Sequence, residues 1–163
     1  MVGVYGAGGC HWPRRGTWRY SRWAVYAGAM FDERPDIQER LDVEIVAWMT
    51  TVNPEGQPQS SPVWFLARDE DIVVYSLTGT PRTRNIAANP RISLHLNSTP
   101  SGGQLVIIEG RAEIIPDPVS AEDDEAYVTK YQAEMEVLGM TPASFSADYP
   151  VRIHIRPTRL RAS

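Results

Sequence analysis

The sequence predicts a mainly β protein, a small antiparallel barrel of six strands with a few short helices and one longer helix before the last strand. Segments rich in β-branched and aromatic residues recur along the chain and are separated by turn residues. Several of them alternate apolar and polar side chains, as strands with one buried face do. Gly110 interrupts the longest of these segments, which is typical of the bends that close a barrel.

The expected elements follow from these local patterns. In chain order they are a helix at 35–43, strands at 44–52, 57–66 and 72–77, a helix at 80–89, strands at 91–97 and 104–115, helices at 117–138 and 141–148, and a strand at 150–156.

The first half of the chain predicts a helix and a hairpin. Ile37 and Leu41 lie four residues apart, as the buried positions of a short helix do. The strands at 44–52 and 57–66 are joined by Asn-Pro-Glu-Gly, a turn sequence that ends in Gly56. Because proline donates no backbone hydrogen bond, Pro62 predicts that the second strand lies at a sheet edge or contains a bulge.

The second half predicts helices with clear ends. Thr80 is a competent N-cap, Pro81 suits the first helical position, and Asn89 followed by proline ends that helix. Ser120 and Asp123 resemble a capping box at the start of the longest helix. Along that helix four apolar or aromatic side chains recur at helical spacing, namely Tyr127, Tyr131, Met135 and Leu138.

Residues 1–29 differ from the rest of the chain. They contain four arginines, three tryptophans and six glycines, carry no acidic residue, and show no period of 2 or 3.6. Arg14-Arg15 resembles a twin-arginine export signal, but Arg19 and Arg22 interrupt the apolar stretch that such a signal needs. We therefore expect a disordered N-terminal extension at 1–29, Met30 as the native start, and a barrel domain at 30–163.

Composition excludes several classes of protein. Residues 30–163 carry 12 basic and 20 acidic side chains, which argues against a general nucleic-acid binder because such a protein needs a basic face. Cys10 is the single cysteine, so no intramolecular disulfide forms. No apolar run reaches the length of a membrane span, and a cytoplasmic protein is expected.

The most informative stretch runs from the end of a strand into the helix at 80–89. A helix N-terminus offers unpaired backbone N–H groups and the positive end of the dipole, which suit an anion. Arg82 and Arg84 bring guanidinium groups beside it, and Ser76 and Thr80 add hydroxyls. These residues predict a phosphate pocket; the alternative is a capped surface helix with two solvated arginines.

Two further features are candidates for ligand contact. In the strand at 57–66, Pro62 and Val63 place an irregularity beside the flat side chain of Trp64, where exposed backbone groups could contact the polar edge of a flavin-like ring; the alternative is a barrel corner with Trp64 in the core. Lys130 is a lone lysine in an acidic helix. It either pairs with Glu134 at i+4 or reaches the acidic tail of a ligand.

No catalytic constellation or metal site is predicted. The three histidines lack ligand spacing, and neither a nucleophile elbow nor a glycine-rich nucleotide motif is present. Haem binding would require His95 or His154 as an axial ligand.

Taken together, the segments resemble the pyridoxamine 5'-phosphate oxidase-like split-barrel superfamily, and within it the actinobacterial branch of F420-dependent oxidoreductases. The resemblance extends over residues 41–161. It is carried by 48–52, 54–59, Pro62-Val63-Trp64-Phe65, Tyr75-Ser76, Arg82-Thr83-Arg84-Asn85-Ile86, 89–95, 109–112, 127–131 and 156–161.

This resemblance implies a split barrel that forms a homodimer with two cofactor sites at the subunit interface. It implies that Arg82 and Arg84 hold the cofactor phosphate with Ser76 nearby, and that residues 59–64 line the deazaflavin ring. Relatives often have lysine where this chain has Arg82, and the C-terminal basic residues that grip pyridoxal phosphate in the B6 oxidases are missing here. The candidate cofactor-binding residues are Gln59, Pro62, Val63, Trp64, Ser76, Thr80, Arg82, Arg84, Asn85 and Lys130.

The expected function is that of an F420-dependent oxidoreductase that transfers a hydride between the deazaflavin and a small organic acceptor. Because such a cofactor carries the difficult chemistry, the absence of a catalytic constellation is consistent with it. The alternatives are an FMN-binding oxidoreductase that uses the same pocket, a carrier of F420 or flavin without turnover, and a haem-binding protein.

Overall fold

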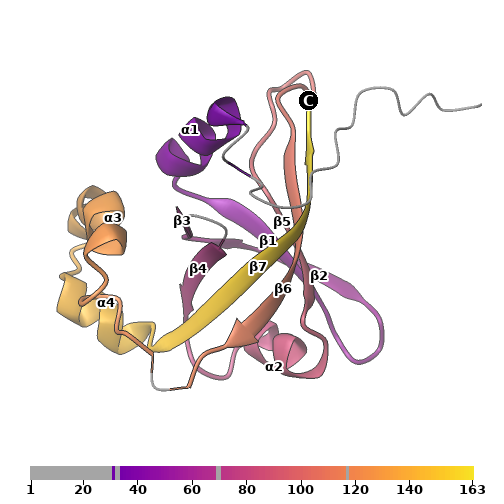
Figure 1. The fold of residues 1–163 in the computed structure, drawn as a ribbon. Helices are drawn as coiled ribbons and strands as arrows, with labels where there is room; N and C mark the ends of the chain where they lie inside the picture. Colours follow the sequence, from indigo (N-terminus) through magenta and orange to yellow (C-terminus); the bar gives the residue numbers. More distant parts are fainter. Residues whose placement is uncertain (1–30, 32–33, 69–70, 117) are drawn as a thin grey trace, which may run out of the picture.

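A computed structural model describes Phe31 and residues 34–68, 71–116 and 118–163. The predictions for residues 1–29 and for a start at Met30 lie outside the described residues. The described chain is mainly β, a curled antiparallel sheet with helices at its ends and at one side (Figure 1).

The elements are, in chain order, α1 (Pro35–Val43), β1 (Ala47–Val52), β2 (Pro58–Val63), β3 (Leu66–Arg68), β4 (Asp71–Ser76), α2 (Pro81–Ala88), β5 (Arg91–His95), β6 (Val106–Ile114), α3 (Glu125–Val137), α4 (Pro142–Asp148) and β7 (Val151–Ala162). The seven strands lie in the order β2-β1-β5-β6-β7-β4-β3. β2 and β3 are consecutive in the chain yet lie at the two edges of this sheet, so the sheet curls back on itself. The prediction of a mainly β antiparallel barrel is confirmed, with one strand more than expected.

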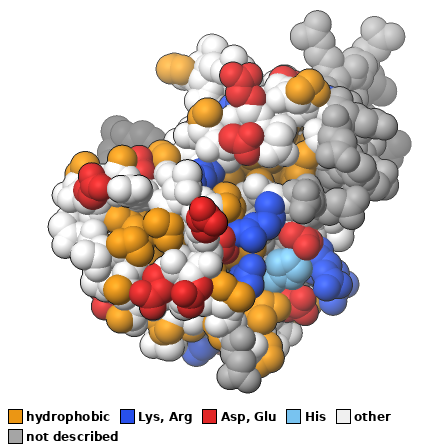
Figure 2. Space-filling view, turned by 60° about the vertical axis from the view of Figure 1, so that its left-hand side comes forward, with side chains coloured by type: hydrophobic (Ala, Val, Ile, Leu, Met, Phe, Trp, Pro, Cys, Tyr) orange, Lys and Arg blue, Asp and Glu red, His pale blue; other side chains and the backbone are white. Residues whose placement is uncertain are grey.

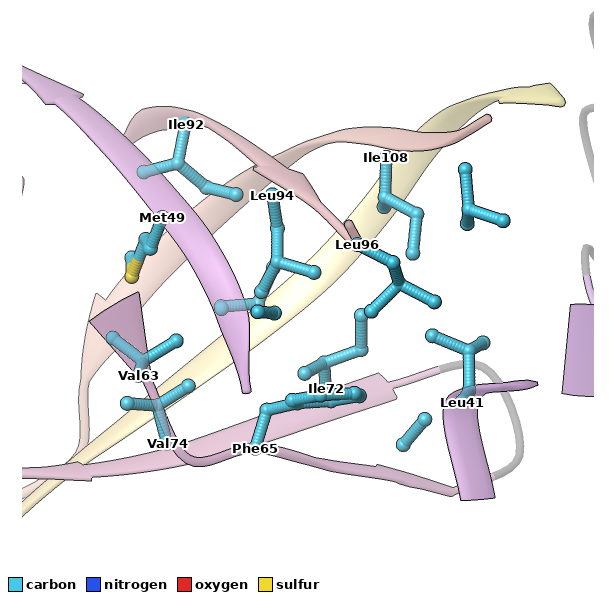
Figure 3. Close-up of a cluster of buried hydrophobic side chains, with 14 of the residues drawn as sticks. Leu41, Met49, Val63, Phe65, Ile72, Val74, Ile92, Leu94, Leu96 and Ile108 are labelled. Atoms are coloured by element: carbon cyan, nitrogen blue, oxygen red, sulfur yellow. The ribbon is translucent and has the colours of Figure 1, made fainter. Parts of the chain in front are cut away.

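The interior of the curl contains a cluster of buried side chains, here called the barrel core. Because successive side chains of a strand point to opposite faces, one face of each strand contributes to it. Figure 3 shows Met49, Ile92, Leu94 and Ile108 from three strands pointing toward one another, with Phe65 beneath them. The described members are mostly aliphatic: Phe31, Ile37, Leu41, Ala47, Met49, Val63, Phe65, Ala67, Ile72, Val74, Ile86, Ile92, Leu94, Leu96, Val106, Ile108, Ala112, Ile153, Ile155, Leu160 and Ala162.

A second cluster, here called the aromatic cluster, lies between the sheet and the helices α3 and α4. β4 is buried on both faces, so that Ile72 and Val74 point into the barrel core while Val73 and Tyr75 point toward the helices. The buried members are Val73, Tyr75, Ala121, Tyr127, Tyr131, Met135 and Phe145, with Ile45, Trp64, Leu66, Met140 and Tyr149 packed against them. Figure 1 shows α3 and α4 together at one side of the sheet.

Several local predictions are confirmed. The Thr80 hydroxyl accepts a hydrogen bond from the Thr83 amide at 3.2 Å and so caps α2. The pairing of β6 with β7 shifts register between Glu109 and Gly110, so the predicted irregularity is a bulge. A Cβ on Gly110 would lie 2.8 Å from the Arg156 carbonyl oxygen, which explains the glycine. β2, which contains Pro62, is an edge strand as predicted.

Three predicted elements differ most from those in the structure. The expected single strand at 57–66 is divided into β2 and β3, and the Tyr131 hydroxyl bonds the backbone of Phe65 at the break. The last strand continues to Ala162 because the β-bulge allows Pro157 to lie within it. The longest helix begins at Glu125, since its N-cap is Asp124 rather than Ser120.

Candidate functional site

Six of the predicted site residues line one cavity of about 420 Å³, here called the Ser76 cavity. The cavity lies where the end of β2, the end of β4 and the start of α2 meet α4 and the segment that follows α3. The six residues are Pro62, Val63, Trp64, Ser76, Thr80 and Arg82. Its volume is within the usual range for small-molecule pockets.

One end of the Ser76 cavity is polar and carries an incompletely paired guanidinium. Arg82 Nη2 donates to Ser61 Oγ at 2.9 Å, while its Nε is buried without a hydrogen-bond partner among the described residues. Burial lowers the pKa of Arg82, although an arginine stays charged at neutral pH. Ser76 is only 2% exposed, and Thr80 caps the helix end beside it. A free donor, hydroxyls and a helix N-terminus together suit an anionic group.

Part of the cavity lining is an aromatic wall that includes Trp64, Phe145 and Tyr149. The Trp64 ring stacks on Phe145, with centroids 5.3 Å apart and planes 14° apart, and Phe145 stacks in turn on Tyr149 at 4.5 Å. Behind this wall Trp64 also stacks on Tyr131, with centroids 4.6 Å apart and planes 3° apart. An aromatic lining in the same cavity as an anion site suits a molecule that carries both a ring system and a phosphate.

Tyr131 holds this wall in place, a role that the sequence did not predict. Its hydroxyl accepts a hydrogen bond from the Phe65 amide at 2.6 Å and lies 2.7 Å from the Phe65 carbonyl oxygen and 3.0 Å from that of Ile45. Burial raises the pKa of Tyr131, so the group stays a neutral phenol. The hydroxyl thereby replaces the sheet hydrogen bonds that are missing at the break between β2 and β3, and the ring fixes the plane of Trp64.

Three predicted residues lie near the cavity without lining it. Asn85 is buried, and its amide donates to Thr51 Oγ1 at 3.0 Å and to Gln59 Oε1 at 2.9 Å, which ties α2 to β1 and β2. Arg84 is exposed and donates to the Gly79 carbonyl. The sequence placed both arginines of α2 on one phosphate, whereas the structure brings only Arg82 to the cavity.

Lys130 lines a different hollow, next to β3 and the end of α1. Its Nζ donates to the Leu41 carbonyl at 2.8 Å and lies 4.0 Å from the centroid of the Phe65 ring. Burial lowers its pKa to about 8, against the opposing charges of Asp42 and Glu44. The ion pair expected with Glu134 is not among the ion pairs of the described residues, because the amine points toward α1 instead.

Residues 34–162 match the pyridoxamine 5'-phosphate oxidase family. The chain belongs to that family. The resemblance seen in the sequence is thus confirmed for the family and its split-barrel fold, while membership of the actinobacterial branch stays a prediction. No curated protein matches the chain.

Solved structures of this family's fold have different named ligands. The chain is similar to an F420 reductase, with 25% identity and a TM-score of 0.59 over 76% of this chain and 94% of that one. It is similar to a candidate pyridoxamine 5'-phosphate oxidase from Listeria innocua, with 19% identity and a TM-score of 0.61 over 80% and 98%. It is also similar to HutZ, a haem storage protein from Vibrio cholerae, with 16% identity and a TM-score of 0.57 over 79% and 94%. The fold is one that binds flavin-type cofactors, and it alone does not select the ligand.

The contacts of the histidines bear on the haem-binding alternative. His154 Nε2 lies 2.9 Å from an Asp71 carboxylate oxygen, and its Nδ1 lies 3.4 Å from one of Glu113. Both ring nitrogens therefore have carboxylate neighbours, which disfavours His154 as an axial haem ligand. Neither His95 nor His154 lines the Ser76 cavity.

In the described ranges no group of three or more His, Cys, Asp or Glu is arranged to hold a metal ion. No helix there is long and apolar enough to cross a membrane.

Proposed function

We propose that this member of the pyridoxamine 5'-phosphate oxidase family is an F420-dependent oxidoreductase that binds the deazaflavin in the Ser76 cavity. The observation that carries the proposal is the presence, in the lining of one cavity, of Arg82, whose buried Nε has no partner in the described chain, and of a stacked aromatic wall. A cofactor with a phosphate and a flat ring system would satisfy both ends. The similarity to an F420 reductase at 25% identity supports the deazaflavin.

Different residues of the Ser76 cavity would bind the phosphate and the ring system of the cofactor. Arg82, Ser76 and Thr80 would hold the phosphate at the start of α2. Pro62, Val63 and Trp64 would line the ring system; Val63 is the last residue of β2 and Trp64 lies in the break after it. Gln59 and Asn85 would support this site from outside the cavity, since the Asn85 amide donates to Gln59 and to Thr51 and so links α2 to the first two strands.

When bound, F420 supplies two-electron hydride chemistry, and the protein's part is to position the reacting groups and keep water away. Tyr75 also lines the cavity, but its hydroxyl donates to the Val119 carbonyl at 3.1 Å, and burial raises its pKa to about 12. It is therefore a poor source of a proton at neutral pH. We accordingly assign no catalytic side chain and expect solvent to supply the proton for the acceptor.

The resemblance to F420-dependent oxidoreductases also supports a homodimer with its cofactor sites at the subunit interface and a small organic acceptor as the second substrate. From the composition of the chain we further propose a cytoplasmic location and residues 30–163 as the functional unit. FMN is the second candidate cofactor. It shares the phosphate and the flat ring system, so the two ends of the Ser76 cavity would suit it as well.

The test is a titration of the protein with F420 and, separately, with FMN, followed by ligand fluorescence. Arg82→Ala should weaken F420 binding by more than about tenfold, roughly 1.4 kcal/mol. Arg84→Ala is the matched control, because this second arginine of α2 lies outside the cavity; it should change the affinity by less than about threefold. Tighter binding of FMN would change the cofactor and keep the site. Binding of neither would refute the proposed function.

A further inference from the structure

A second hollow, of about 820 Å³, lies between the end of α1, β3, the start of α3 and β7. We call it the Arg152 hollow. It shares no lining residue with the Ser76 cavity, and Trp64 and Leu66, which are two residues apart, line the cavity and the hollow respectively. Nothing in the proposed cofactor site uses it.

Arg152 is the feature that calls for an explanation. It is partly buried on β7, its Nε is buried without a hydrogen-bond partner, and its guanidinium has no ion pair among the described residues. Leaving a buried donor unpaired costs free energy, which a ligand could recover. Figure 2 shows one face of the molecule, on which basic side chains gather near the middle and acidic side chains lie around them.

Arg68 lies in the same hollow but is already anchored. Its Nη2 contacts the Asp124 carboxylate at 2.5 Å, and Asp124 also accepts from the Tyr75 hydroxyl at 3.3 Å. These contacts fix the position of the Arg68 guanidinium, while its own Nε is buried and unpaired like that of Arg152. The Lys130 amine already donates a hydrogen bond to the Leu41 carbonyl. Within the described part of the chain, Arg152 is thus the lining cation of the hollow whose side chain has neither a hydrogen bond nor an ion pair.

The remaining lining decides which anion fits. The exposed carboxylates of Asp42, Asp123 and Glu125 lie in the same hollow and would repel a doubly charged phosphate more strongly than a singly charged carboxylate. The guanidinium fork matches the geometry of a carboxylate. Ile45 and Leu66 add apolar lining that could cover a hydrocarbon body.

We propose that the Arg152 hollow binds a small organic carboxylate, with the carboxylate on the Arg152 guanidinium and the apolar body against Ile45 and Leu66. The site is independent of the cofactor proposal.

The test follows amide and arginine Nε signals of the isotope-labelled full chain during titration with benzoate, with benzyl alcohol and inorganic phosphate in parallel. Benzoate should shift the signals of the hollow in a saturable way and bind at least about tenfold more tightly than benzyl alcohol or phosphate. Arg152→Gln should weaken benzoate binding by at least about tenfold. The matched control is Arg156→Gln, on the same strand and face, whose side chain is 71% exposed and paired with Glu113; it should change binding by less than about twofold.

Three results would overturn the inference: no saturable response to benzoate, tighter binding of phosphate than of benzoate, or equal benzoate affinities of the Arg152→Gln and Arg156→Gln variants. If Arg152→Gln does not fold, Arg152→Lys replaces it, since lysine keeps the charge but loses the fork. A loss of about threefold or more is then expected, and an unchanged affinity would equally overturn the inference.

Discussion

The barrel core consists mostly of aliphatic side chains, whereas the aromatic cluster contains buried Tyr75, Tyr127, Tyr131 and Phe145. An aliphatic side chain only has to fill space, and its neighbours can be exchanged for others of similar volume. A buried tyrosine must also place its hydroxyl. Where the hydroxyl finds partners, as that of Tyr131 does, the ring is held in one plane. The first cluster therefore gives the protein stability, and the second gives the Ser76 cavity its fixed wall.

The largest effect should come from the barrel core. Leu94 is fully buried within it, and Leu94→Ala should lower the free energy of unfolding by about 2–5 kcal/mol because it removes packed methyl groups and leaves a space. Denaturant unfolding measures this. Ligand affinity of the molecules that stay folded should be unchanged, since Leu94 does not line the Ser76 cavity. A change of affinity as large as that of Arg82→Ala would show that the two clusters are not separate in function.

The next largest effect on stability should come from removing the hydroxyl of Tyr131. Tyr131→Phe keeps the stacked ring and leaves backbone groups of Phe65 and Ile45 without their partner, which should cost about 1–3 kcal/mol of stability. The plane of Trp64 would be less constrained, so cofactor affinity should fall as well. Tyr127→Phe is the matched control one turn earlier, because that hydroxyl is buried and has no partner among the described residues. It should be neutral or stabilising by up to about 1 kcal/mol. Equal effects of the two variants in thermal and denaturant unfolding would refute the assignment.

The smallest effect concerns the pH dependence of stability. Burial lowers the pKa of Lys130 from 10.5 to about 8, so the folded protein releases this proton before the unfolded chain does. The unfolded chain then binds more protons between pH 8 and 10.5, and the contribution of Lys130 to stability rises with pH over that window. The buried tyrosines act in the opposite direction above about pH 10, so pH 8 to about 10 is the useful range.

Lys130→Met should remove this rise. Unfolding curves recorded across the range should show the wild type gaining stability relative to the variant as the pH increases. A constant difference would mean that Lys130 titrates alike in both states.

Local patterns were enough to predict much of the fold and the placement of part of the candidate site. The N-cap at Thr80, the irregularity at Gly110 and the edge position of Pro62 each depend on a residue's own backbone preferences, which the sequence displays directly. The same holds for Ser76 and Arg82, which flank one strand-to-helix turn and therefore reach one cavity.

The wrong or incomplete predictions involve contacts between distant segments. The break after β2 has its backbone groups paired by the hydroxyl of Tyr131, 66 residues further on, so no local pattern marks it. The direction in which Lys130 and Arg84 point depends on how each helix is rotated against the sheet, and charge alone does not reveal that rotation. The tyrosine repeat of α3 predicted a buried face but not which of its hydroxyls would find a partner.

The open edges of the sheet have a consequence for the protein at high concentration. An unpaired strand is a template onto which another molecule can add a strand, the first step toward aggregation. β2 contains Pro58 and Pro62, which lack the amide hydrogen that pairing with an added strand requires, and β3 is only three residues long. The prolines that interrupt the regular strand pattern thus also help to keep neighbouring molecules apart.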